Sequence, residues 1–80
     1  MIELYTLPGC PYCKKVEHKL EELAVPYEKH EVPASRAART EVQAISGQSG
    51  VPVIVDADNG VSGMAESADI VSYLDRVYAE

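Results

Sequence analysis

The sequence predicts an α/β fold in which a four-stranded mixed sheet carries three helices, in the order β-α-β-α-β-β-α. Two observations lead to this prediction. Short runs of β-branched or alternating apolar residues are interspersed with stretches whose apolar residues recur every three or four positions. Five prolines and five glycines punctuate these stretches. The length of 80 residues, 46% of them hydrophobic, predicts a single domain over residues 1–80 with one small core.

The first half of the chain has the pattern of a βαβ unit. Residues 2–6 are β-rich and end before Pro8, which predicts a strand. A helix is expected from Pro11 to about Ala24, since its apolar residues share one face: Cys13, Val16, Leu20 and Leu23. Residues 27–32 are expected to form an edge strand, because their charges discourage further pairing. The two strands should be parallel, joined by a right-handed crossover.

The middle of the chain predicts a second helix and a buried strand. Ala38, Val42 and Ile45 lie at helical spacing, and Gly47 is expected to end that helix in the left-handed conformation. Val51 to Val55 is almost entirely apolar and β-branched, which is typical of a central strand buried on both faces.

The last part of the chain predicts an antiparallel hairpin followed by a helix. Asp58-Asn59-Gly60 supplies the turn, and residues 61–64 form the return strand. The final helix has an apolar face, and Ser67 stands near its start as a candidate cap. That face consists of Ile70, Leu74 and Val77, with Val71 and Tyr78 beside it.

Composition and charge exclude several kinds of partner. A net charge of −6 argues against nucleic acid or an anionic membrane surface. No apolar run approaches the roughly 18 residues of a membrane span. The N-terminus Met1-Ile2-Glu3-Leu4 lacks the charged and apolar regions of a secretory signal. We therefore expect a cytoplasmic protein, and a monomer.

Cys10 and Cys13 are the two cysteines of the chain, and their spacing indicates redox chemistry. A bond between them closes too short a loop to constrain the unfolded chain much. Cys10 is expected just before the first turn of a helix, where free backbone N–H groups and the helix dipole favour a thiolate, with Lys14 and Lys15 on the next turn. Cys13 lies one helical turn further on and is less exposed. We expect Cys10 to be the nucleophile and Cys13 the resolving thiol.

Two alternatives for the cysteine pair remain open. In the first alternative, the two cysteines form half of a zinc site, and His18 and His30 are the other candidate ligands. His18, however, lies five residues beyond Cys13, about 140° around the helix, and we expect no bound metal. In the second alternative, the cysteines are inert residues of the core and have no redox role.

The residues from Leu4 to Cys13, Leu-Tyr-Thr-Leu-Pro-Gly-Cys-Pro-Tyr-Cys, resemble the active-site segment of glutaredoxins. Gly50-Val51-Pro52 stands where that family has Thr-Val-Pro with a cis proline. The segment from Glu66 to Leu74 resembles the Glu-Ser element of two-domain glutaredoxins and of glutathione-transferase N-terminal domains. The resemblance covers essentially the whole chain and implies a thioredoxin-like fold.

The resemblance implies that glutathione or a related small thiol is the co-substrate, with no bound cofactor. The backbone of Val51, next to cis-Pro52, would pair with the cysteinyl unit of the thiol. Glu66 and Ser67 would hold its γ-glutamyl end, since a helix N-terminus suits a carboxylate. Tyr12 would line the groove.

Each of these residues also has a purely structural interpretation. Ser67 is then a helix cap. Pro52 starts a strand with an ordinary trans bond. Tyr12 is a surface aromatic. Glu66 is an acidic residue favoured by the dipole of the first helical turn.

The sequence departs from the glutaredoxin pattern at two places. Many members have a lysine three residues before the first cysteine, to hold the glycyl carboxylate, where this chain has Leu7. Arg39, Arg36 or Gln48 would have to substitute, although each is also expected as a solvated helix or loop residue. Met64-Ala65 replaces a frequent Gly-Gly. γ-Glutamylcysteine, which lacks the glycine, would lose nothing at Leu7.

The function predicted from these residues is that of a dithiol glutaredoxin, which reduces glutathione mixed disulfides and protein disulfides. Its partners would be a small thiol and glutathionylated or disulfide-bonded proteins. We expect no helical second domain like that of two-domain glutaredoxins and transferases, which favours disulfide exchange over conjugation. One alternative is a thioredoxin-like electron donor serviced by a reductase, which Leu7 and Gly50 favour. The other is a carrier of an iron–sulfur cluster held by Cys10 and external thiols.

Overall fold

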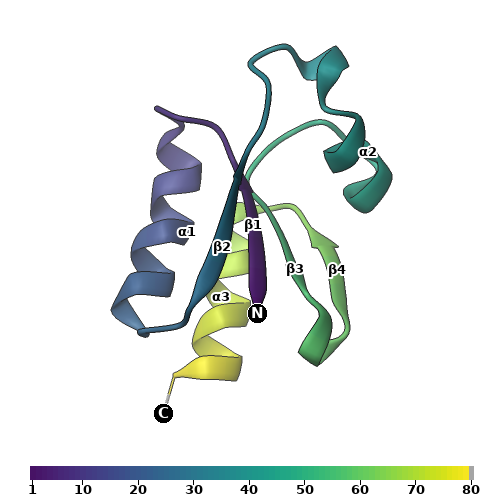
Figure 1. The fold of residues 1–80 in the computed structure, drawn as a ribbon. Coiled ribbons are helices and arrows are strands. Elements are labelled where there is room, and N and C mark those ends of the chain that lie inside the picture. Colours follow the sequence, from purple (N-terminus) through teal and green to yellow (C-terminus); the bar gives the residue numbers. More distant parts are fainter. Residues whose placement is uncertain (80) are drawn as a thin grey trace.

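The computed structural model describes residues 1–79 and has the predicted order of strands and helices (Figure 1). Two short 3₁₀ turns, Arg36–Ala38 and Ala57–Asn59, complete it. None of the helices described is long and apolar enough to cross a membrane. The elements are β1 (Ile2–Thr6), α1 (Pro11–Glu22), β2 (Tyr27–Glu31), α2 (Thr40–Ser46), β3 (Val53–Asp56), β4 (Val61–Met64) and α3 (Ser67–Tyr78).

The four strands form one mixed sheet in the order β2-β1-β3-β4. β1 is parallel to β2, whereas β3 is antiparallel to both β1 and β4. These pairings confirm the predicted parallel first pair and antiparallel last pair. They also confirm β2 as an edge strand and β3 as a central one. In the register, Leu4 of β1 lies opposite Ile54 of β3.

Helices cover both faces of the sheet. α1 and α3 lie side by side on one face, where they bury the main core with apolar residues of β1 and β3 (Figure 1). α2 covers the other face, where Val42 packs in a smaller cluster with Tyr5 and Val53. Neighbouring residues of a strand point to opposite faces, so Leu4 and Tyr5 join different clusters. The buried residues of the main core are Ile2, Leu4, Val16, Leu20, Ile54, Ile70, Tyr73 and Leu74.

Several element boundaries differ from the sequence prediction by one or two residues, among them the ends of α1 at Glu22 and of β2 at Glu31. β3 begins at Val53 instead of Val51, since Pro52 has no N–H with which to pair in the sheet. α2 is regular only over Thr40–Ser46, and Gly47 ends it with a φ of +77°, as predicted. Ser67 is the first residue of α3 and not its cap. Glu66 holds the cap position without a side-chain capping bond, so the cap interpretation of Ser67 was wrong.

Arg39 is the largest departure from expectation. Instead of being solvated, the residue is only 5% exposed. Its guanidinium donates hydrogen bonds to three backbone carbonyls, those of Pro33 at 2.7 Å, Ser49 at 2.9 Å and Ala34 at 3.1 Å. Arg39 therefore joins the segment after β2 to the segment before β3. Its guanidinium donates to backbone carbonyls inside the protein instead of facing the solvent.

Candidate active site

The cysteine pair occupies the N-terminus of α1, at the end of the loop that follows β1. Cys10 is the cap residue, with an extended backbone, and Pro11 takes the first helical position, where its missing N–H leaves no bond unmade. The Cys10 sulfur accepts a hydrogen bond from the backbone N–H of Cys13 at 3.3 Å. Both thiols are free, Cys10 partly exposed and Cys13 buried. The backbone thus provides a donor for negative charge on the Cys10 sulfur.

Cys13 lies in a different environment from Cys10. Burial raises the pKa of the Cys13 thiol, and the neighbouring Cys10 sulfur adds to this increase. The Thr6 side chain and the Leu7 backbone act on this pKa in the opposite direction, but they do not outweigh burial. Cys13 is fully buried, so it is placed to react with a sulfur bonded to Cys10 and not with a large external disulfide.

A groove of about 290 Å³ lies beside the cysteine segment. It gathers all five residues that the sequence proposed for ligand binding, although they come from three separate parts of the chain. Neither cysteine lines the groove, and Tyr12 connects it to the cysteine pair. The lining residues are Tyr12, Gln48, Gly50, Val51, Pro52, Ala65, Glu66 and Ser67.

Two features of the groove bear on the sequence expectations. The Val51–Pro52 bond is cis, which contradicts the alternative of an ordinary trans proline at the start of a strand.

Tyr12 is 58% exposed, and the Lys15 ammonium lies 5.4 Å from the centre of its ring. Sequence reasoning missed this cation–π pair, although Lys15 follows Tyr12 at a helical spacing of three.

The three candidates for the glycyl end of the thiol are placed very differently. Arg39 is committed to backbone carbonyls, and Arg36 does not line the groove. Gln48 does line the groove, but its side-chain amide is hydrogen-bonded to the backbone of Gly50. Gln48 Oε1 accepts from the Gly50 N–H at 2.5 Å, and Nε2 donates to the Gly50 carbonyl at 3.0 Å. Gln48 is thus placed to hold the backbone that precedes Val51.

The two histidines lie apart from the cysteine pair. His18 faces a second pocket, on α1. His30 stacks on Tyr5, with ring centres 4.9 Å apart, and its Nε2 lies 3.1 Å from Glu3 Oε1. Within residues 1–79 no three His, Cys, Asp or Glu side chains gather in the way that a metal site needs. The cysteine pair is therefore not joined by the further ligands that the zinc alternative requires.

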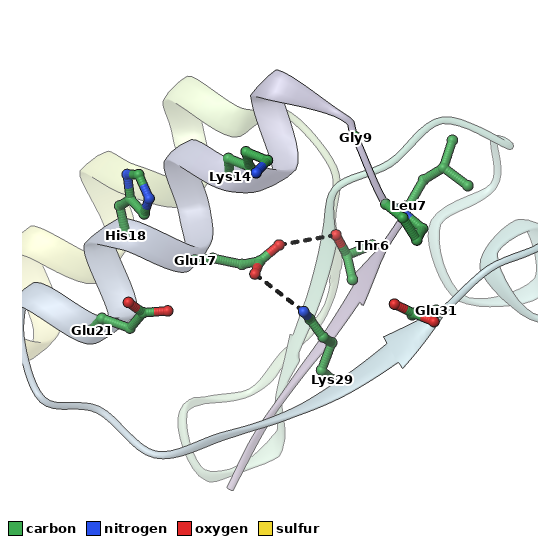
Figure 2. A pocket seen from close by; sticks show the side chains of 10 residues that line it. Thr6, Leu7, Gly9, Lys14, Glu17, His18, Glu21, Lys29 and Glu31 are labelled. Atoms are coloured by element: carbon green, nitrogen blue, oxygen red, sulfur yellow. Dashed lines mark hydrogen bonds and ion pairs between the residues drawn. The ribbon is translucent and has the colours of Figure 1, made fainter.

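The second pocket, also of about 290 Å³, lies between α1, the end of β1 and the edge strand β2 (Figure 2). Leu7 lies here and not in the groove, beside Pro8, Gly9 and Lys14. The rest of the pocket is lined mainly by charged or polar side chains, which are Thr6, Glu17, His18, Glu21, Lys29 and Glu31.

Comparison with known proteins gives one family. Residues 2–61 match the family model of glutaredoxin. Over 54 residues the chain is 39% identical to an uncharacterized glutaredoxin-like 8.6 kDa protein in the rubredoxin operon of Clostridium pasteurianum, covering 68% of this chain and 72% of that protein. Over 66 residues it is 35% identical to a glutaredoxin of Neisseria meningitidis, covering 81% and 78%.

Two solved structures contain the same fold as part of a larger protein. Glutaredoxin 2 from Salmonella typhimurium, in complex with glutathione, is 25% identical to this chain with a TM-score of 0.85. The match covers 100% of this chain and 35% of the glutaredoxin 2 chain. A glutathione transferase homolog from Sulfitobacter, with bound glutathione, is 26% identical with a TM-score of 0.83, covering 98% of this chain and 37% of its own. This chain therefore spans little more than a third of either protein. These likenesses confirm the thioredoxin-like fold.

Proposed function

The chain belongs to the glutaredoxin family, and from that membership and the site we propose that it is a dithiol glutaredoxin. Its substrates would be mixed disulfides between a protein and a small thiol, and protein disulfides. The single observation that carries the proposal is the cysteine arrangement. A partly exposed Cys10 caps α1, and the buried Cys13 donates its backbone N–H to the Cys10 sulfur.

The first step would be attack by the Cys10 thiolate on the small-thiol sulfur of a mixed disulfide. A bond forms between Cys10 and that sulfur, and the protein leaves as a thiolate, which takes a proton from water. A second small thiol, as its thiolate, then attacks the sulfur of the bound one. The two small-thiol molecules leave together as their disulfide, and Cys10 returns to the thiolate.

Protein disulfides would need Cys13. Cys10 forms a mixed disulfide with one protein sulfur, and the Cys13 thiol loses its proton and attacks the Cys10 sulfur. The protein departs fully reduced, and an intramolecular disulfide remains between the two cysteines. Burial of Cys13 supports this division of labour, since its sulfur is accessible only from within the protein.

The groove supports the proposed small-thiol site. Val51 would offer its backbone to the cysteinyl unit, with Tyr12 and Pro52 beside it. The first N–H groups of α3, with Glu66 and Ser67, would hold the γ-glutamyl end, since a helix N-terminus attracts a carboxylate. Glutathione and γ-glutamylcysteine share that end. In the cell we propose a cytoplasmic monomer.

The test is turnover of a glutathionylated peptide by the purified protein, with glutathione or γ-glutamylcysteine as reductant. Cys10→Ser should abolish turnover with both. Cys13→Ser should retain it and lose reduction of a protein disulfide such as that of insulin. Turnover that survives in Cys10→Ser contradicts the proposal.

A second candidate is a thioredoxin-like donor serviced by a reductase. The position of Leu7 favours it, because Leu7 faces the charged second pocket and adds nothing to the groove for a small thiol. Reduction by a thioredoxin reductase, combined with no turnover on either small thiol, would support this candidate.

A further inference from the structure

The turn between β3 and β4 contains Asn59 and Gly60, an asparagine followed directly by a glycine. Gly60 has a φ of +73°, in the left-handed region that glycine adopts without steric cost. Asn59 is exposed, but its side-chain amide donates two hydrogen bonds, to Asp56 Oδ2 at 2.9 Å and to the Tyr78 hydroxyl at 3.0 Å. The turn therefore needs glycine at one position and uses an amide at the other.

The hydrogen bonds of Asn59 connect this turn to the C-terminal end of α3. Tyr78 is the last residue of α3, and its hydroxyl donates to the buried carboxylate of Asp56 at the end of β3. The turn and the end of α3 lie at the same end of the sheet (Figure 1). Replacing the Asn59 amide by a carboxylate would remove a donor and put a second negative charge beside Asp56.

We propose that Asn59 is a site of spontaneous deamidation, and that its conversion loosens the contact between the β3–β4 turn and α3. Asparagine is a thermolabile residue. Its reaction is fastest before glycine, because the backbone nitrogen of the next residue is the nucleophile and glycine has no side chain to hinder it. The inference goes beyond the proposed function and does not depend on it.

The reaction needs only water and hydroxide. The Gly60 N–H loses its proton to hydroxide, the nitrogen bonds to Asn59 Cγ, and the bond from Cγ to Nδ2 breaks. Nδ2 takes up a proton from water and leaves as ammonia, so a cyclic succinimide remains. Water then opens the ring at either carbonyl, which gives aspartate or isoaspartate at position 59.

The native contacts of the turn oppose this reaction. The Gly60 N–H donates to the Ala57 carbonyl at 3.2 Å, so its nitrogen is already engaged. The Asn59 amide is held by its two bonds to Asp56 and Tyr78. Attack on the amide carbon therefore requires the turn to open first, and the rate of conversion reports how often it opens.

The product is less compatible with the fold than asparagine. A carboxylate at position 59 cannot donate to Asp56, and like charges repel. Asp58 lies in the same turn, and the Met1 ammonium is already paired with Asp58 Oδ2 at 3.6 Å. Isoaspartate also adds a methylene to the backbone, inside the turn that sets Asp56 opposite Val61.

Incubation of the purified protein at pH 8 and 37 °C for a month, followed by peptide mass mapping, tests the site. Asn59 is the only asparagine in the sequence, so the mass gain from replacing NH₂ by OH has one fast source. Asn59→Gln is the control for the site, because the longer side chain cyclises far more slowly. Tyr78→Phe removes a contact of Asn59, and Tyr27→Phe is its matched control, since the Tyr27 hydroxyl bonds to Glu21 instead.

The mass gain should appear at Asn59 in the folded protein, more slowly than in guanidinium chloride, and should be absent from Asn59→Gln. Tyr78→Phe should convert at least about fivefold faster, as the loss of one hydrogen bond allows, and Tyr27→Phe at the original rate. The midpoint of thermal unfolding should fall by about 5–10 °C in Asn59→Asp. Turnover at 25 °C should not change, because α1 begins at the opposite end of the sheet (Figure 1).

Two results would overturn the inference. The absence of any mass gain at Asn59 in the folded protein, while the unfolded chain converts, contradicts the modification site. An unchanged unfolding midpoint in Asn59→Asp contradicts the loosening of α3. The aged product, separated from the unmodified protein by its charge, gives the same measurement without a variant.

Discussion

The Cys10 sulfur and the Cys13 backbone N–H are joined by a hydrogen bond of 3.3 Å. The bond exists because the cap position of a helix brings its side chain to the free N–H three residues later, a position usually filled by serine or aspartate. Here the capping atom is also the proposed nucleophile. The local geometry that starts α1 therefore also directs a hydrogen-bond donor at the sulfur that must carry negative charge.

Replacing Arg39 by methionine should destabilise the protein without touching the cysteines. Methionine keeps much of the apolar stem but leaves the carbonyls of Pro33, Ala34 and Ser49 without their donor. We expect a loss of about 2–4 kcal/mol in the free energy of unfolding, measured by urea denaturation. Arg36→Met is the control, because Arg36 is exposed, and it should cost less than about 0.5 kcal/mol. Equal losses in the two variants would contradict this account of Arg39.

Replacing Gln48 by alanine should weaken binding of the small-thiol substrate. The side-chain amide of Gln48 holds both backbone groups of Gly50, directly before the proposed binding residue Val51. We expect KM for a glutathionylated peptide to rise about fivefold with little change in kcat, as when an interaction shared by ground and transition states is lost. Gln43→Ala, on the exposed side of α2, should leave both constants unchanged. A fall in kcat at constant KM would show that Gln48 acts in another way.

Asp56 should make the stability of the protein depend on acid pH. Its carboxylate is buried at the end of β3 and accepts hydrogen bonds from Tyr73 at 2.7 Å, from Asn59 at 2.9 Å and from Tyr78. Burial by itself raises the pKa of Asp56, but the hydrogen bonds from Tyr78, Tyr73 and Asn59 outweigh it, so the pKa lies below its ordinary value. Asp56 thereby links β3 to α3 and to the turn before β4.

The direction of the pH effect follows from the lowered pKa. A carboxyl whose pKa is lower in the folded than in the unfolded chain stabilises the fold above the unfolded value, about 4. That contribution disappears as the pH falls through the lower folded value. Asp56→Asn should therefore cost about 1–3 kcal/mol at pH 7 and should show a smaller loss of stability between pH 5 and pH 2. Parallel acid profiles of the two proteins would contradict the prediction.

Tyr78 should produce the corresponding effect in alkali. Burial, together with the hydrogen bond to Asp56, raises the pKa of Tyr78 to about 12. A neutral tyrosine favoured in this way contributes its full stabilisation below the unfolded pKa of about 10 and loses it as the pH rises through the folded value. Thermal unfolding of Tyr78→Phe should accordingly vary less between pH 10 and pH 12 than that of the unchanged protein. Equal slopes would show that this hydrogen bond adds nothing to stability.

The features that sequence predicted correctly are those governed by local rules. Apolar periodicity located the helices and strands, and Pro11 marked the start of α1 with Cys10 at its cap. Gly47 was identified from its position after an apolar stripe, and it has the left-handed backbone expected there. Each of these depends on residues within a few positions along the chain.

The features that sequence could not provide depend on segments that meet only in the folded protein. Arg39 was expected to be solvated, because nothing near it in sequence shows that three carbonyls from two loops surround it. Thr6 and Glu17 lie eleven residues apart, and only the packing of α1 on the sheet brings them together. Ser67 was missed as the first helical residue because helix ends are uncertain by one position or two.

The central claim is that the Cys10 sulfur takes up the small thiol while Cys13 resolves. The most direct measurement is intact mass and peptide mapping of Cys13→Ser after incubation with a glutathionylated peptide. The proposal predicts one glutathione per chain, disulfide-bonded to Cys10 and removed by added glutathione. An unmodified chain, or glutathione bonded to Cys13 in the Cys10→Ser variant, would contradict it.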